Sequence, residues 1–172
     1  GCASLIDITL PFVGNTPSAT NTTGGANKGK ALLGFIFGST SYTGGVSKNQ
    51  YYSGTSTYSY YFPQALRNVT ITGGTQIKYG AFSNINILTN IIIPNTITTI
   101  NTYAFAGCTG LTNFEIPENV SSVGPDAFQN CSGLTSLYFK PTNCLTMGSS
   151  TNPVFNNCIA LSKINISNNV TR

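Results

Sequence analysis

A pair of residues, Ala-Phe, recurs in this chain of 172 residues at a constant interval. It stands at residues 81–82, 104–105 and 127–128, so successive copies begin 23 residues apart, and a degenerate copy, Val154-Phe155, follows 27 residues later. A repeat of this length cannot enclose a core alone and buries its apolar face by stacking on its neighbours. The interval therefore predicts a solenoid whose coils share one core.

The residues around each pair repeat as well. The second copy has its recurring positions at Ile97, Ile100, Ala104, Phe105, Cys108, Leu111, Phe114, Ile116 and Pro117. Each copy contains L-x-x-[LIF]-x-[LIF], which is typical of the strand in a leucine-rich repeat. Its last residues alternate with period two, so we expect a short strand with inward apolar side chains, and a turn or single helical turn at Ala-Phe on the opposite wall. The predicted fold is a β-rich α/β solenoid of leucine-rich repeat coils with a parallel sheet on one face.

The same frame divides the chain into three parts. Residues 1–11 match residues 107–117 and are interpreted as a half repeat, while residues 66–172 hold the leucine-rich repeats, about four coils. Both ends fall inside a repeat, so we expect the array to continue upstream in a parent protein and to be truncated mid-repeat downstream. An atypical N-terminal cap is the alternative for the first part. Residues 12–65 form a Gly/Ser/Tyr-rich island without the repeat pattern.

This island is expected to be an ordered, β-rich insertion, because a structureless loop of its length is uncommon in a compact domain. Its apolar run, residues 31–38, should be buried. Residues 62–66, Phe-Pro-Gln-Ala-Leu, are interpreted as the I-P-x-x-V turn by which the chain re-enters the repeats. Tyr, Ser, Gly and Asn together are typical of adaptable binding loops. The island's candidate contact residues are Tyr51, Tyr52, Tyr58 and Tyr60, unless these tyrosines only cover the flank of the solenoid.

The full pattern, I-P-x-x-V-x-x-[IV]-x-x-x-A-F-x-x-C-x-x-L-x-x-[FI]-x-I-P, resembles the BspA-like (Treponema pallidum-type) leucine-rich repeats over residues 1–11 and 66–172. The departures are Ile85 in place of Cys, Val154 in place of Ala, and an insertion at residues 143–153. The resemblance implies a bacterial protein that is secreted or held at the cell surface. It also implies adhesion to host proteins, other cells or matrix.

Composition argues against catalysis and against several partners. The chain has no His, and its carboxylates are Asp7, Glu115, Glu118 and Asp126. A histidine base, a Ser-His-Asp triad and an imidazole metal ligand are therefore excluded, and no catalytic, cofactor or metal residue is predicted. The eight Lys and Arg residues are too scattered for nucleic-acid binding, and no apolar run is long enough to span a membrane.

Five cysteines are present, four of them at one repeat position. Cys2, Cys108, Cys131 and Cys158 are expected to form a column of buried free thiols, because equivalent residues of stacked coils point the same way and not toward one another. Cys144 lies outside the frame and is the candidate for a reactive thiol. The chain has no C-x-x-C pair, so neither a zinc site nor a redox motif is supported.

Residues between the inward apolar positions of each strand should face outward on a concave sheet, the surface with which solenoids bind partners. The central outward row is predicted to be Thr9, Thr70, Ile92, Glu115, Tyr138 and Asn165. A parallel row is predicted to be Asp7, Asn68, Asn90, Asn113, Ser136 and Lys163. From these rows we select Ile92, Asn113, Glu115, Tyr138 and Asn165 as candidate contact residues. The alternative is a face that is merely solvated or covered by the island.

Three functions remain in competition at this point. The first is a non-catalytic adhesion module that recognises a protein or glycan partner through the strand face, the island or both. The second is a structural spacer that presents another domain. The third is a glycan hydrolase using Glu115 and Glu118, which stand three residues apart with Pro117 between them. Uncapped coil ends also predict self-association, because solenoids normally cover their ends with a polar cap.

Overall fold

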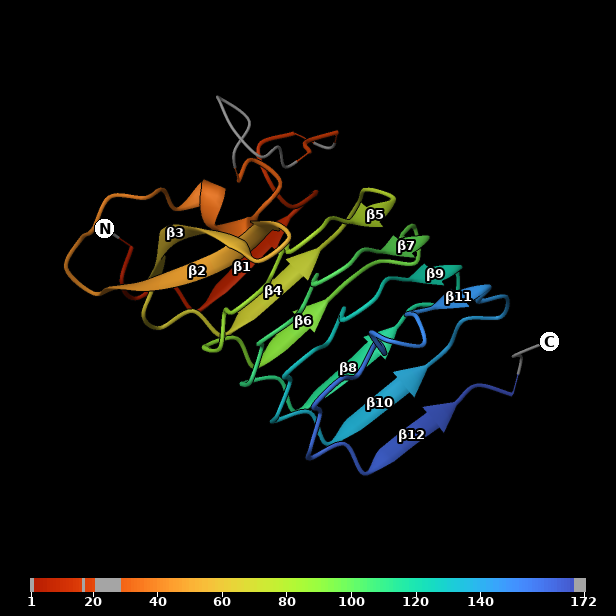
Figure 1. The fold of residues 1–172 in the computed structure, drawn as a ribbon. Helices are drawn as coiled ribbons and strands as arrows, with labels where there is room; N and C mark the ends of the chain where they lie inside the picture. Colours follow the sequence, from red (N-terminus) through yellow and green to blue (C-terminus); the bar gives the residue numbers. More distant parts are fainter. Residues whose placement is uncertain (1, 17, 21–28, 169–172) are drawn as a thin grey trace.

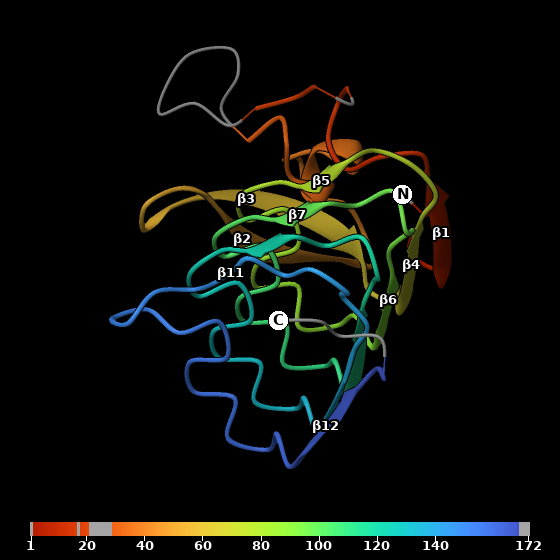
Figure 2. The same ribbon diagram turned by 90° about the vertical axis from the view of Figure 1, so that its right-hand side faces the viewer.

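The computed structural model describes residues 2–16, 18–20 and 29–168, so residues 1, 17, 21–28 and 169–172 of the predicted parts lie outside it. The chain winds into stacked coils that contribute strands to two parallel sheets (Figure 1). Figure 2 shows these sheets as different sides of the stack. The predicted solenoid is confirmed, and the described residues contain one short 3-10 helix, η2 (Leu33–Ile36), beside the strands.

Six strands form what we call the long-strand sheet. They are β1 (Asp7–Leu10), β4 (Asn68–Ile71), β6 (Asn90–Ile92), β8 (Asn113–Ile116), β10 (Ser136–Phe139) and β12 (Lys163–Ile166). They bond in two groups, in the order β1-β4-β6 and β8-β10-β12. The short-strand sheet is continuous and contains β5 (Gln76–Ile77), β7 (Thr99–Ile100), β9 (Ser122–Val123) and β11 (Thr146–Met147).

Equivalent repeat positions lie side by side in the long-strand sheet. In its first group, Thr9 pairs with Thr70, and Thr70 pairs with Ile92. In its second group, Tyr138 pairs with both Glu115 and Asn165. The order of the predicted central row is therefore confirmed within each group. Along each strand, the residues before and after this outward row point inward, as the period-two pattern requires.

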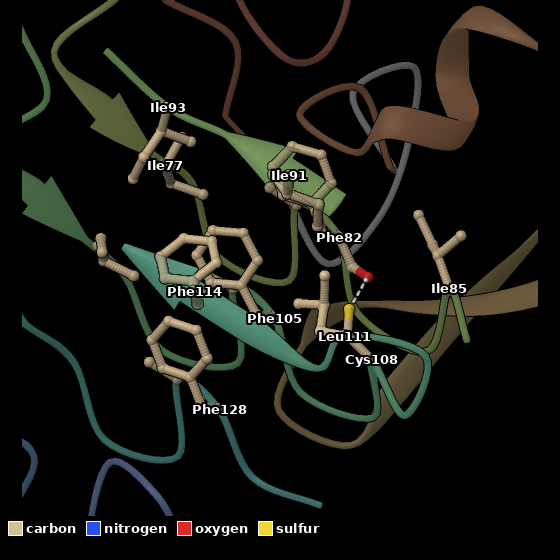
Figure 3. Packing of buried hydrophobic residues seen from close by; sticks show 14 of the residues in the cluster. Ile77, Phe82, Ile85, Ile91, Ile93, Phe105, Cys108, Leu111, Phe114 and Phe128 are labelled. Carbon is tan, nitrogen blue, oxygen red and sulfur yellow. Dashed lines mark hydrogen bonds between the residues drawn. The ribbon is translucent and has the colours of Figure 1, made fainter. Parts of the chain in front are cut away.

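A column of phenylalanine rings runs through the core (Figure 3). Phe82, Phe105 and Phe128 are fully buried. Their ring centroids are 5.2 Å apart for the first pair and 4.9 Å for the second, and both pairs are stacked. These distances are close to the spacing of neighbouring strands, about 4.8 Å. Each coil therefore rises by about one strand spacing, and the core is shared between coils as the repeat interval predicted.

The Ala-Phe turn contains two positions with a left-handed backbone. The residue before Ala has φ of 61° at Gly80, 56° at Tyr103 and 53° at Asp126. The residue before the Cys position has φ of 58° at Asn84 and 72° at Gly107. Glycine and asparagine adopt this region most easily, which explains their recurrence one residue before Cys. Tyr103 is the bulky exception among the residues with this backbone conformation.

The column of thiols forms only in the middle of the stack. Cys108 and Cys131 are buried, and each thiol donates a hydrogen bond of 3.1 Å to a phenylalanine carbonyl of the preceding coil. Cys158 makes the same bond at 3.0 Å but is half-buried. Cys2 is exposed, so its predicted burial is wrong: in the described chain, no preceding coil covers it. Cys144 is half-buried, and burial raises the pKa of its thiol.

The island is ordered where it is described, and much of it is an antiparallel hairpin of β2 (Gly45–Ser53) and β3 (Ser56–Pro63). The hairpin packs on the Ala-Phe turns through Gln50, whose buried side-chain amide donates to the carbonyl of Ala81 at 2.8 Å. This agrees with the predicted β-rich insertion. Residues 31–34 are buried, but Phe35 and Ile36 are 38% and 40% exposed, so burial of the whole apolar run was wrong.

Part of the island takes the place of an Ala-Phe turn. In the repeats, the N–H of Phe82 donates to the carbonyl of Ala104 in the next coil, at 2.7 Å. The N–H of Leu33 donates to the carbonyl of Ala81 in the same way, at 2.9 Å. Leu33 therefore stands where the preceding coil would place its phenylalanine. The island therefore supplies the turn opposite the long-strand sheet in the first coil, although its sequence lacks the repeat pattern.

The chain re-enters the repeats at a different turn from the predicted one. The N–H of Leu66 donates to the carbonyl of Pro63, as that of Leu111 does to Cys108, and both leucines precede their strand by two residues. Pro63 thus occupies the Cys position, and the I-P-x-x-V interpretation was wrong. The I-P-x-x-V turn closes with a similar bond, from Ile97, so proline alone did not distinguish the two turns.

Candidate binding face

The outer side of the long-strand sheet carries exposed side chains of an unusual kind for a solvated surface. Ile92 on β6 is 51% exposed, and Tyr138 on β10 is 44% exposed. Glu115 and Asn165 flank Tyr138 on the neighbouring strands, and Asn113 is exposed on the parallel row. The exposure of Ile92 and Tyr138 shows that the described part of the island does not cover them.

One ion pair is found among the described residues, and it lies on this face. The Lys140 ammonium lies 2.8 Å from a Glu115 carboxylate oxygen, and both side chains are about half exposed. Lys140 was not among the predicted contact residues because it follows the end of β10. The signal was present, since Lys140 lies two residues after Tyr138 and such residues point to the same side of a strand.

Two hollows open on the face, one on each side of this ion pair. The first has a volume of about 280 Å³, and the residues that line it include Glu118, Tyr138, Lys140 and Asn165. The second has a volume of about 230 Å³ and lies between β6 and β8, where Ile92, Asn113 and Glu115 line it. The structure thus brings all five candidate residues of the strand face into two neighbouring hollows.

The second hollow coincides with a seam in the long-strand sheet. No backbone ladder joins β6 to β8, although both strands are fully described and every other neighbouring pair in the sheet is bonded. At the start of the strands, the N–H of Thr135 donates to the carbonyl of Thr112, but Thr112 makes no such bond to the coil before it. The two strands therefore face each other across this seam without the regular ladder that joins the other neighbouring pairs.

The island tyrosines are mostly engaged in packing. Tyr52 and Tyr60 are buried, while Tyr51 and Tyr58 are half-buried. The hydroxyl of Tyr60 donates to the carbonyl of Gly29 at 3.0 Å, and its ring lies 4.9 Å from that of Tyr58. Burial, with a smaller contribution from Tyr58, raises the pKa of Tyr60 to about 12. These four residues therefore belong to the joint between island and solenoid more than to a free surface.

A further aromatic cluster lies where the hairpin meets the coils. The ring of Tyr103 is 5.2 Å from that of Tyr51 and 5.6 Å from that of Tyr79. The Tyr79 hydroxyl donates to the carbonyl of Gly54 at 2.8 Å, and burial raises its pKa to about 12. These contacts hold the hairpin to the stack and provide packing for Tyr103 in its left-handed conformation. Sequence reasoning missed this cluster because Tyr79 and Tyr103 lie in different repeats.

The two glutamates considered for hydrolysis do not share a hollow. Glu115 and Glu118 line different hollows, and Glu115 is paired with Lys140. The buried carboxylate of Asp126 accepts hydrogen bonds from three side-chain amides. One of them, Asn152 at 2.6 Å, fixes the insertion at residues 143–153 to the preceding coil.

In the described chain, no three His, Cys, Asp or Glu residues lie close enough to hold a metal ion. The described helix is also far too short to cross a membrane.

The fold has the defining features of a leucine-rich repeat solenoid. Its coils are stacked, a strand follows the recurring leucine of each coil, and these strands form a parallel sheet along one side. The family described as "BspA type Leucine rich repeat region" matches residues 53–172 of this chain in 6 copies. The chain therefore belongs to this family, as the repeat pattern indicated.

Solved structures agree with the family. A leucine rich cell surface protein from Faecalibacterium prausnitzii is 29% identical with a TM-score of 0.51, and the match covers 60% of this chain and 27% of that protein. A leucine-rich repeat protein from Bacteroides ovatus is 26% identical with a TM-score of 0.53, over 61% and 26% of the two chains. The leucine-rich repeat protein of T. pallidum shares the fold. It is 20% identical with a TM-score of 0.51, and the match covers 59% of this chain and 56% of that protein. The matched parts span about a quarter of the first two proteins, and no curated protein sequence matches this chain significantly.

Proposed function

We propose that this chain is a non-catalytic binding module of a secreted or cell-surface bacterial protein. It recognises a partner through the outer face of the long-strand sheet. Membership of the BspA-type family and the likeness to a protein described as a cell surface protein support this location. Solenoids commonly use such extended sheets for binding, because they present many side chains on one rigid surface.

The observation that carries the proposal is the exposure of Tyr138 and Ile92 beside the Glu115–Lys140 ion pair. Tyrosine is favoured at the centre of binding sites, since it offers a large rigid contact area with a polar tip. The face is favoured over the island because Tyr52 and Tyr60 are buried and cannot reach a partner without unfolding the joint.

The test is adhesion of the purified chain to immobilised host matrix protein, to mucin and to intact bacterial cells. Tyr138→Ala should reduce binding to the recognised surface about tenfold, which corresponds to the loss of one well-placed anchor. Thr9→Ala is the matched control, because Thr9 lies on the same row at the opposite end of the sheet. Absence of binding to all three surfaces, or equal binding by both variants, would refute the proposed use of this face.

A further inference from the structure

The outer face of the long-strand sheet is poor in apolar side chains. Twelve residues make up its two rows, and only Ile92 and Tyr138 among them are apolar or aromatic. The others are mainly amides and hydroxyls, with few charges. A site for a folded protein normally has a dry apolar centre surrounded by a polar rim. This face has the reverse balance, which favours a ligand that is itself rich in hydroxyl groups.

The seam between β6 and β8 adds main-chain hydrogen-bonding groups to the same face. Residues 90–93 and 113–115 line this hollow, where no ladder joins the two strands, and main-chain N–H and C=O groups in such a place favour a ligand that can both donate and accept. A sugar hydroxyl does both. The amides of Asn90 and Asn113 line the same hollow and offer further donors and acceptors around it.

The other hollow supplies an aromatic platform. Tyr138 is exposed between Glu115 and Asn165, and Lys140 lines the same hollow. The flat ring of Tyr138 can pack against the apolar C–H face of a sugar ring while the neighbouring polar groups bind its hydroxyls. The Glu115–Lys140 ion pair joins the two hollows, since Glu115 lines the seam and Lys140 lines the tyrosine hollow.

The charges select among saccharides. Glu115, Glu118 and Lys140 are the acidic and basic side chains that line the two hollows, and their formal charges sum to one net negative charge. An anionic polysaccharide would meet this charge at close range, where like charges repel. A neutral saccharide has no such penalty.

We propose that the two hollows form one site for a neutral, linear oligosaccharide. Tyr138 packs against one sugar ring, and the seam between β6 and β8 binds hydroxyls of a neighbouring ring. This inference rests on the proposed function and names the chemical class of its partner.

The experiment is an NMR titration of the ¹⁵N-labelled chain with four defined sugars: cellotetraose, chitotetraose, laminaritetraose and mannotetraose. At least one should give saturable shifts of the backbone amides of residues 90–92 and 113–115 and of Tyr138, with slower hydrogen exchange at the seam. Tyr138→Ala should weaken binding about tenfold, whereas Tyr138→Phe should retain most of it because the ring remains. Asn113→Ala should weaken binding without unfolding the chain, since Asn113 is exposed, and Thr9→Ala should bind as the parent does.

Three outcomes would overturn the inference. One is no saturable shift with any of the four sugars while the face still binds matrix protein in a Tyr138-dependent way; the proposed function then stands and its partner is a protein. Another is shifts confined to the hairpin cluster of Tyr51, Tyr79 and Tyr103. The third is no response to sugars together with no binding to matrix protein, mucin or cells, which refutes the proposed function as well.

Discussion

Gln50 is the residue through which the island is joined most directly to the solenoid. Its side chain is fully buried, accepts the N–H of Gly34 at 2.8 Å and donates to the carbonyl of Ala81 at 2.8 Å. In Gln50→Leu, the Ala81 carbonyl keeps the N–H of Leu33 at 2.9 Å, but the buried Gly34 N–H loses its acceptor. An unsatisfied buried donor costs about 1–3 kcal/mol. We expect the free energy of unfolding to fall by about that amount, which is a large share of the roughly 5–15 kcal/mol of a typical domain.

Urea denaturation followed by circular dichroism measures this loss, and hydrogen exchange locates it. The amides of Leu33 and Gly34 should exchange faster in Gln50→Leu, whereas those of the Phe105 turn should change less. Gln76→Leu is the matched control, because Gln76 is exposed on β5 and its loss should stay within about 0.5 kcal/mol. If both variants were equally stable, the reasoning that one buried amide holds the island to the coils would be refuted.

Four further predictions concern the core, the thiols, the tyrosine cluster and the end of the stack. Phe105→Ala should cost about 3–5 kcal/mol in urea denaturation, since the ring is buried between two others; a loss below about 1 kcal/mol would contradict the shared core. In the native state a thiol reagent should label exposed Cys2 rapidly and buried Cys108 only on unfolding, because burial raises the pKa of Cys108 to about 12; equal rates would be inconsistent with the thiol column. The folded pKa of Tyr79 is raised to about 12 from 10.0, so the neutral form is favoured in the folded state and stability should fall as pH rises from 10 toward 12; Tyr79→Phe should show a smaller fall in the urea midpoint over that range. Ile164 is 52% exposed on β12, whose outer edge is unpaired in the described chain, so light scattering should detect self-association that Ile164→Lys reduces; a monomer at every concentration would argue against it.

The repeat frame could be predicted because every coil solves the same packing problem. Phe82, Phe105 and Phe128 stack because they stand at one position of a repeat whose coils rise by one strand spacing. The order of the outward row followed from strand alternation alone, which is why Glu115, Tyr138 and Asn165 were identified as neighbours. Their role as contact residues remains a prediction.

The position of the island in the stack could not be predicted in this way, because its backbone matches the repeat while its side-chain pattern does not. Leu33 takes the place of a phenylalanine and Pro63 that of a cysteine, with hydrogen bonds to main-chain atoms that any residue type supplies. A search for recurring apolar side chains does not detect such positions, because their residue types differ from those of the repeat. The exposure of Cys2 was missed for a related reason, since burial depends on the neighbouring coil and not on the position within one coil.

The sequence by itself determined the coil length, the inward and outward alternation of the strands and the column of aromatic rings, because these follow from local periodicity repeated without interruption. Only the tertiary structure decided that Gln50 joins the hairpin to the Ala-Phe turns, that Lys140 pairs with Glu115, and that the sheet opens between β6 and β8. Each of these depends on how closely two distant segments approach. That distance is set by the packing of the whole stack, so no single repeat encodes it.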